Sequence, residues 1–145
     1  MEKIFNASPF VQAAAFYLRY HVFVLEQSIP PTLEFDRLDT SDRAYLVIFD
    51  GTVPIATVRY QTTEKTCLNP DRLCVHPDYR NLGLGTDLLR VIEKRALDEN
   101  CTTSKLSAET TAQAFYEKNG YSVISAIFEE DGIPCVEMKK DLVSK

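Results

Sequence analysis

The sequence predicts a mixed α/β domain that spans residues 1–145, with both antiparallel and parallel neighbours in its sheet. Turn signals divide the chain into short alternating segments, and β-branched and aromatic runs flank an Asp-Gly turn, which is typical of a hairpin. A short apolar strand, a glycine loop and a helical pattern follow in order. Hydrophobic residues make up 45% and charged residues 26% of the chain, as in globular proteins. The chain has no internal repeat, so we expect one domain.

The N-terminal third predicts a strand followed by an amphipathic helix. Residues 2–6 are a candidate first strand. Apolar residues then recur at spacings of 3 and 4 from the region of Pro9 to Leu25, with Ser8 as N-cap and Pro9 in the first turn. Pro30 and Pro31 predict the end of this helix. Its aromatic residues are expected to form core and pocket wall rather than a cofactor stack; they are Phe16, Tyr17, Tyr20 and Phe23.

The middle of the chain predicts a central antiparallel pair and then a strand. Residues 44–50 and 53–63 flank the Asp50-Gly51 turn. Residues 72–75 form a short apolar strand that ends before Pro77. A helix with apolar spacing leads to Asn100, and the remaining segments are a strand at 104–108, a short helix at 111–119 and a hairpin of 121–128 with 134–139.

Charge and cysteine pattern exclude several classes of protein. Sixteen basic and 21 acidic residues give a net charge of −5, which disfavours a nucleic acid partner. Apolar runs fall far short of the ~20 residues of a membrane helix, and the N-terminus does not resemble a signal peptide, so we expect a cytoplasmic protein without a membrane partner. Cys67, Cys74, Cys101 and Cys135 lack metal-ligand spacing, so we expect reduced thiols and no metal.

The residues with the clearest chemistry lie in the glycine loop. Gly83 and Gly85 can adopt backbone conformations that side chains forbid, and a helix N-terminus follows, so the N–H groups of the loop could bind a phosphate. A dinucleotide fingerprint would need a third glycine where Leu88 stands, and a Walker loop would need Gly-Lys-Ser/Thr. A plain turn is the alternative for the two glycines alone.

Two further motifs give the loop a more specific interpretation. Arg80-x-x-Gly83-x-Gly85, after a strand that ends in Val75-His76-Pro77, resembles the acetyl-CoA signature of the GNAT superfamily of N-acetyltransferases. The segment 114–121, Ala-Phe-Tyr-Glu-Lys-Asn-Gly-Tyr, is similar to the closing helix and turn of that superfamily. Residues 19–27, with Glu34 and Asp36 downstream, resemble the first helix of the ElaA-like subgroup. The resemblance covers about residues 15–140.

The resemblance implies a GNAT-like fold: a mixed, mostly antiparallel sheet of about six or seven strands with flanking helices. It also implies a V-shaped splay between the strands near residues 72–75 and 104–108, where acetyl-CoA would bind as co-substrate. The backbone N–H of Val75 would stabilise the oxyanion, and Tyr116 would be the general acid. The implied cofactor-binding residues are Leu73, Cys74, Val75, Arg80, Asn81, Leu82, Gly83, Leu84, Gly85, Thr86 and Tyr116.

Several roles stay open from the sequence. Glu26 and Glu34, and also Asp36, are candidates for the general base or for acceptor binding, with a solvated surface acid as the alternative for each. His76 could relay a proton, or be structural. Glu109 stands where the superfamily often has an amide residue that touches the cofactor. We expect Cys74 to be a packing residue rather than a nucleophile, because Leu73 and Val75 face the opposite side of the strand.

The predicted function is transfer of an acetyl group from acetyl-CoA to a primary amine by direct attack in a ternary complex. The alternatives are an acyl-CoA sensor that binds the cofactor without chemistry and a pure interaction domain. The acceptor is a small-molecule or peptide amine that the sequence does not specify. The terminal hairpin could pair with a second copy, which leaves a homodimer open.

Overall fold

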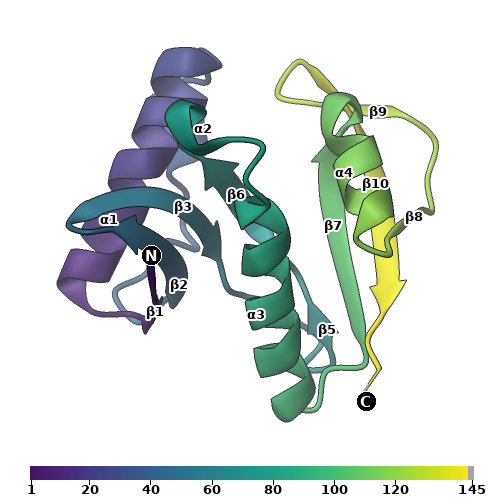
Figure 1. Cartoon of the computed structure of the whole chain (residues 1–145). Coiled ribbons are helices and arrows are strands. Elements are labelled where there is room, and N and C mark those ends of the chain that lie inside the picture. The colour runs from purple at the N-terminus through teal and green to yellow at the C-terminus, as the bar shows by residue number, and fades with distance from the viewer. Residues whose placement is uncertain (144–145) are drawn as a thin grey trace.

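The computed structural model describes residues 1–143, which form two sheets that diverge from one another (Figure 1). One sheet has the order β1-β2-β3-β6, and the other has β4-β5-β7-β10-β8 with β9 beside β10. Six of the ten described strands have five or more residues, and the other four have two or three. Within the described residues β5 pairs with β7 in parallel and the other pairings are antiparallel, which confirms the expected mixed and mostly antiparallel arrangement.

The first sheet consists of β1 (Glu2–Asn6), β2 (Tyr45–Asp50), β3 (Val53–Arg59) and β6 (Asp71–Val75), all antiparallel. Strand β2 is apolar almost throughout because both of its faces are covered. Tyr45, Val47 and Phe49 pack on the side of helix α1 (Pro9–Arg19). Leu46 and Ile48 face the opposite core, which includes helix α3 (Leu84–Asp98). Gly51, with φ 62°, opens the predicted β2–β3 turn.

The second sheet is built around β7 (Thr103–Glu109) and β10 (Ile133–Asp141), and β7 pairs along its whole length with Cys135–Asp141 of β10. Its short strands are β4 (Thr62–Thr63), β5 (Cys67–Leu68), β8 (Ser122–Val123) and β9 (Phe128–Glu130). The sequence did not separate β4 and β5 from their neighbours. The β9–β10 turn has positive φ at both Asp131 and Gly132, as a two-residue hairpin turn of this kind requires.

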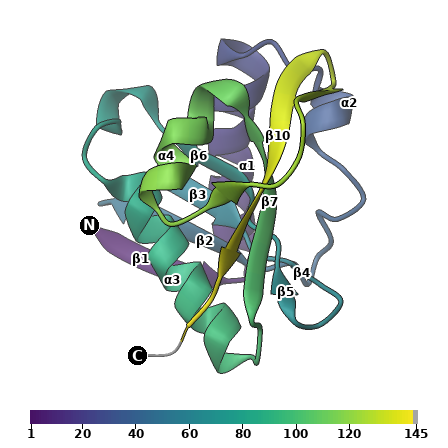
Figure 2. The same cartoon turned by 90° about the vertical axis from the view of Figure 1, so that its right-hand side faces the viewer.

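The two sheets separate just after β5. Strand β5 pairs with β7 in parallel, at Cys67 with Thr103 and Leu68 with Ser104. The chain then continues into β6, which pairs with β3 and not with β7. The predicted splay between residues 72–75 and 104–108 is confirmed. Figure 1 shows the two arms diverging upward from β5, and Figure 2 shows the arm with β7 and β10 in front.

The predicted first helix is only partly correct. Helix α1 ends at Arg19, and Tyr20–Glu26 continues it as a π-helix, η1. Such wide turns are rare and are often found at functional sites. Ser8 stands at the N-cap, but its hydroxyl donates to Asn6 Oδ1 instead of capping the helix. Pro31 begins a second, four-residue helix, α2 (Pro31–Glu34), which the sequence did not predict.

The remaining helical segments flank the splay. The turn η2 (Pro77–Tyr79) leads into the glycine loop and α3, while η3 (Thr110–Ala112) and α4 (Gln113–Lys118) follow β7. Helix α3 packs against β3 and β6. None of the helices in residues 1–143 has the length and apolar character needed to cross a membrane.

Candidate active site

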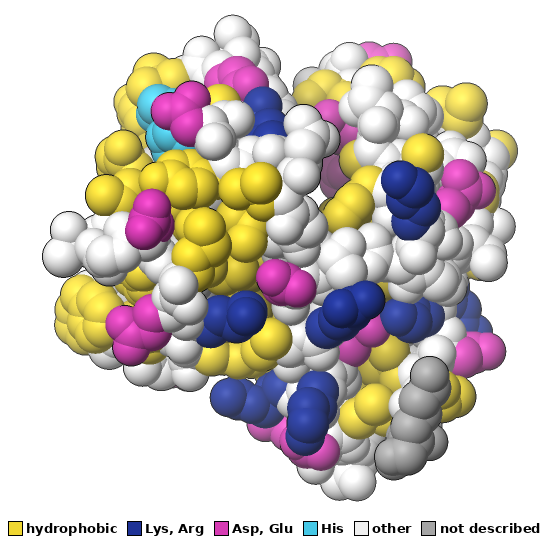
Figure 3. Space-filling model, in the orientation of Figure 1, with side chains coloured by type: hydrophobic (Ala, Val, Ile, Leu, Met, Phe, Trp, Pro, Cys, Tyr) yellow, Lys and Arg dark blue, Asp and Glu magenta, His cyan; other side chains and the backbone are white. Residues whose placement is uncertain are grey.

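A cavity of about 430 Å³ lies between the two arms of the splay. One wall comes from η1, the segment through α2 and strand β6, and the other comes from β7, α4 and the β9–β10 hairpin. Figure 3 shows this hollow open to solvent between the two halves of the molecule. Of the predicted site residues, Leu73, Glu34 and Tyr116 line it, and so does Glu109.

The edge of β6 that faces the splay has free backbone groups. The N–H of His76 donates to Ile55 O on β3 at 2.8 Å. Because successive residues of a strand direct their N–H and C=O groups to opposite edges, those of Val75 point away from β3. The Val75 carbonyl accordingly accepts from Arg80 Nε at 3.2 Å. The N–H groups of Leu73 and Val75 therefore face the open edge.

The loop after β6 has an unusual backbone. Asn81 and Gly83 have φ values of 65° and 78°, in the left-handed region that favours glycine at the second position. Gly83 is the N-cap of α3, so the first N–H groups of that 15-residue helix have no intrahelical partner. Loop and helix start together provide donors for an anion.

The prediction that Gly85 is needed for a backbone conformation that side chains forbid is wrong. Gly85 is helical, and its φ is not positive. A Cβ at this position would lie 2.8 Å from Phe115 Cζ on α4. The absence of a side chain at Gly85 thus lets α4 pack against the start of α3, which brings the motif 114–121 to the glycine loop.

Arg80 is held by a residue from the π-helix. Its guanidinium donates to both carboxylate oxygens of Glu26, at 2.8 and 2.7 Å. The hydrogen bonds from Arg80 lower the pKa of Glu26, which makes this carboxylate a weak base. Glu26 does not line the cavity. The structure therefore places this candidate base beside the glycine loop and not in the cavity lining.

Tyr116 lies on the wall opposite β6. Its ring contacts Phe115 and Tyr121 at centroid distances of 5.0 and 5.8 Å. Burial, together with the nearby carboxylates of Asp71 and Glu109, raises the pKa of Tyr116. The hydroxyl is therefore protonated at neutral pH.

Glu34 is buried at the base of the opposite wall, with 3% of its side chain exposed. Its Oε2 accepts from Arg19 Nε and lies near Arg72 Nε, both at 3.0 Å. Burial raises the pKa of Glu34 although both guanidinium groups favour its charged form. The alternative of a solvated surface acid is wrong for this residue.

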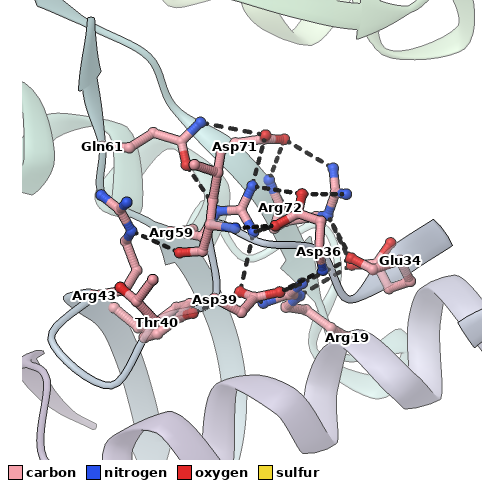
Figure 4. Close-up of polar contacts among 12 residues, drawn as sticks. Arg19, Glu34, Asp36, Asp39, Thr40, Arg43, Arg59, Gln61, Asp71 and Arg72 are labelled. Carbon is pink, nitrogen blue, oxygen red and sulfur yellow. Dashed lines mark hydrogen bonds and ion pairs between the residues drawn. The ribbon is translucent and has the colours of Figure 1, made fainter. Parts of the chain in front are cut away.

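The guanidinium groups around Glu34 belong to a buried ion network (Figure 4). Arg19 donates to Asp39 at 2.6 and 2.9 Å, and Arg59 donates to both Asp36 and Asp39. Asp36 also pairs with Arg72 and does not line the cavity. The network ties the segment after α2 to β3 and β6, and it fixes the wall that carries Glu34.

His76 and Cys74 lie outside the cavity lining. His76 Nδ1 accepts from the N–H of Asp78 at 3.1 Å, and its ring stacks on His21 at 5.2 Å. Cys74 is a free, buried thiol in the core on the α1 side of β6, where burial raises its pKa. The expectation that Cys74 packs in the core is confirmed.

The sequence did not reveal the π-helix or the ion network. One signal for the network was a charged residue, Arg59, which is the buried last residue of β3. A buried arginine needs carboxylate partners, and these come from positions 12, 20 and 23 residues away. These separations follow no regular spacing, so the sequence could not show which acidic residues pair with Arg59.

Comparisons with known proteins agree on the family. Residues 11–142 match the model of the acetyltransferase (GNAT) domain. The uncharacterized N-acetyltransferase YjcF of Bacillus subtilis is 36% identical over 88% of this chain and 90% of that protein. A crystal structure of a candidate N-acetyltransferase from Lactobacillus plantarum has a TM-score of 0.94 and 38% identity, covering 98% of each chain. Escherichia coli ElaA has the same fold, with a TM-score of 0.84 and 23% identity over 96% of this chain and 98% of that one. The chain belongs to the GNAT family of acetyltransferases.

Proposed function

We propose that this protein transfers an acetyl group from acetyl-CoA to a primary amine by direct attack in a ternary complex. The observation that carries the proposal is the position of Tyr116 across one cleft from the open edge of β6. Membership of the GNAT family supports an acyl-CoA co-substrate.

The open edge and the glycine loop suit coenzyme A. The N–H and C=O groups of Leu73 at the open edge can pair with the pantetheine amides as an added strand does, which leaves the Val75 N–H for the thioester oxygen. The exposed loop residues Asn81 and Leu82, followed by the α3 N-terminus, can hold the pyrophosphate through backbone N–H groups. The remaining loop positions, Arg80 and Gly83 to Thr86, complete the proposed cofactor site; Cys74 contributes backbone only.

The transfer needs three groups in the cleft. The neutral amine attacks the thioester carbonyl carbon, and the Val75 N–H stabilises the negative charge that develops on the oxygen. As the C–S bond breaks, the Tyr116 hydroxyl gives its proton to the leaving thiolate. The amine nitrogen loses a proton to a carboxylate, and the N-acetylated amine and the free thiol of coenzyme A result. Proton exchange through solvent then returns the carboxylate and Tyr116 to their starting states.

We assign the base to Glu34. Burial raises its pKa, which makes it a stronger base than a solvated carboxylate. Arg19 and Arg72 hold its Oε2, while no hydrogen-bond partner within residues 1–143 contacts its Oε1. The free oxygen can accept a proton from the acceptor.

Glu34→Gln tests the assignment against Asp36→Asn, a matched change in the same ion network outside the cavity lining. We expect Glu34→Gln to lower kcat/KM at least 100-fold and to abolish the acidic limb of the pH–rate profile. Asp36→Asn should keep that limb even if it lowers the melting temperature. Thiol release with mixed amines gives the rate, and calorimetry gives the affinity for acetyl-CoA. Tight binding of acetyl-CoA with no turnover on any amine would favour a non-catalytic sensor instead.

We also propose that the protein acts in the cytoplasm, because its four cysteines are free thiols, as is usual in reducing compartments. A homodimer through the terminal hairpin stays a prediction, which sedimentation would test.

A further inference from the structure

The charges in the cleft are strongly one-sided. Five carboxylates and one guanidinium line the cavity. Glu34 and Asp71 belong to the wall formed by α2 and β6, and the others belong to the opposite wall at the end of β7 and at the β9–β10 hairpin. These others are Glu109, Glu130 and Asp131. Figure 3 shows acidic side chains inside the hollow and at its rim.

Arg72 does not neutralise the opposite wall. Its Nε lies 3.0 Å from Glu34, and its two terminal nitrogens lie 3.2 Å from Asp71 and Asp36. All three nitrogens are therefore directed at acids of its own wall. Within residues 1–143, no ion pair involves Glu109, Glu130 or Asp131.

A second observation at the inner end of the cleft points to a ligand with N–H donors. Glu34 is 3% exposed, and its Oε2 is held by two guanidinium groups. Its Oε1 has no hydrogen-bond partner. Every fully buried side-chain oxygen in the described part of the chain has a partner, so Oε1 is not fully buried. The Oε1 atom therefore opens into the cavity that Glu34 lines. An acceptor that fits must bring a donor to this atom.

We propose that the acceptor is a small molecule with at least two amino groups, an aliphatic diamine or polyamine. This inference rests on the proposed function. One amino group reaches Glu34 and is acetylated, while a second, as an ammonium ion, binds the unpaired carboxylates of Glu130 and Asp131 at the hairpin. A monoamine would leave those carboxylates unpaired. The cavity volume of about 430 Å³ lies in the range of small-molecule sites, which favours a compact acceptor over a folded protein surface.

The departure from the family pattern at Glu109 fits the same acceptor. A carboxylate cannot donate a hydrogen bond to an acceptor atom of the cofactor, but it can bind an ammonium group. Glu109 ends β7 opposite Cys135, and it lines the same cavity as Tyr116 and the hairpin acids.

The experiment compares 1,4-diaminobutane with 1-aminobutane, which differ by one amino group. We expect kcat/KM for the diamine to be at least tenfold higher, the value of about one charge-assisted hydrogen bond. The double variant Glu130→Gln/Asp131→Asn should remove this preference, so that kcat/KM for the diamine falls to the value for the monoamine. The control is Glu129→Gln, which removes one carboxylate charge from an exposed neighbour outside the cavity lining and should keep the preference.

A binding measurement separates failure of this inference from failure of the proposed function. Calorimetry with the protein saturated with coenzyme A should give at least tenfold tighter binding of the diamine than of the monoamine, whether or not acetyl transfer occurs. Acetylation of both amines with equal kcat/KM, equal binding of both, or a preference that survives in the double variant would overturn the diamine acceptor. Absence of turnover with intact diamine preference in binding would overturn only the proposed reaction.

Discussion

Tyr116→Phe tests the proposed general acid by removing one oxygen atom. Burial and two carboxylates raise the pKa of this tyrosine, and no hydrogen bond contributes to the shift. The phenylalanine ring can keep the contacts with Phe115 and Tyr121 at 5.0 and 5.8 Å, and no partner loses a hydrogen bond. The free energy of unfolding should therefore change by less than about 0.5 kcal/mol.

The value of kcat should fall in Tyr116→Phe although the stability stays unchanged. General-acid catalysis contributes about 10²- to 10⁴-fold, but a thiol with a pKa of about 8.5 is already a good leaving group. We therefore expect kcat to fall about 10- to 100-fold, which corresponds to about 1.4 to 2.7 kcal/mol of transition-state stabilisation. The affinity for acetyl-CoA should stay within about twofold, because the change removes no charge. Initial rates of thiol release, calorimetry and thermal melting measure the three quantities.

Tyr121→Phe is the matched control, five positions along the chain. The Tyr121 hydroxyl lies 2.8 Å from Ser104 Oγ and donates to Glu93 Oε2 at 2.8 Å, so its loss leaves buried groups unpaired. This variant should lose about 1 to 3 kcal/mol of stability with kcat little changed. Full activity of Tyr116→Phe at unchanged stability would refute the assigned role. Parallel loss of stability and activity would make Tyr116 a structural residue.

Three further outcomes follow from the packing and the charges. Cys74→Ala should keep kcat within about twofold, and mass spectrometry should detect no acetyl-enzyme, since the thiol faces the α1 core and burial raises its pKa. Gly85→Ala puts a Cβ 2.8 Å from the Phe115 ring. The clash should outweigh the higher helix propensity of alanine, so the free energy of unfolding in urea should fall by about 1 kcal/mol. Combination with Phe115→Leu should recover the loss. Burial alone would raise the pKa of Asp39, but hydrogen bonds led by that from Arg19 hold it below its usual range. The stabilising contribution of the Asp39 carboxylate is thus present above about pH 4 and is lost on acidification. Asp39→Asn should be less stable overall, and its free energy of unfolding should fall less steeply as the pH is lowered. An unchanged slope would contradict this.

The order of the longer elements could be predicted because each of these has a local signal. The β-branched and aromatic runs on either side of the Asp50-Gly51 turn indicated β2 and β3, and the glycine loop with its apolar helix indicated β6 and α3. The short strands β4 and β5 have only two residues each, too few for a periodic pattern. The π-helix has the apolar spacing of an α-helix, so the sequence could not show where α1 changes its hydrogen bonding.

The parts of the candidate site that belong to sequence motifs could be predicted. The glycine loop and the segment with Tyr116 matched a family pattern, and both line or flank the splay. Glu26 and Glu34 were equivalent in the sequence because nothing local distinguishes them. Their environments come from Arg80 and Arg72, 54 and 38 residues away in the sequence. Separations of this length are decided by tertiary structure alone.

The ion network also bears on the order in which this protein folds. Arg19 and Arg59 are fully buried, and a guanidinium group cannot shed its charge to ease desolvation. Each therefore needs its carboxylate partners before it can enter the interior, and the partner that they share, Asp39, lies on an irregular segment that local propensity would leave among the last to be ordered. Helix α1, this segment and β3 must therefore close in one cooperative step. The wall that carries Glu34 is consequently part of the folding unit itself, and it is ordered whenever the protein is folded.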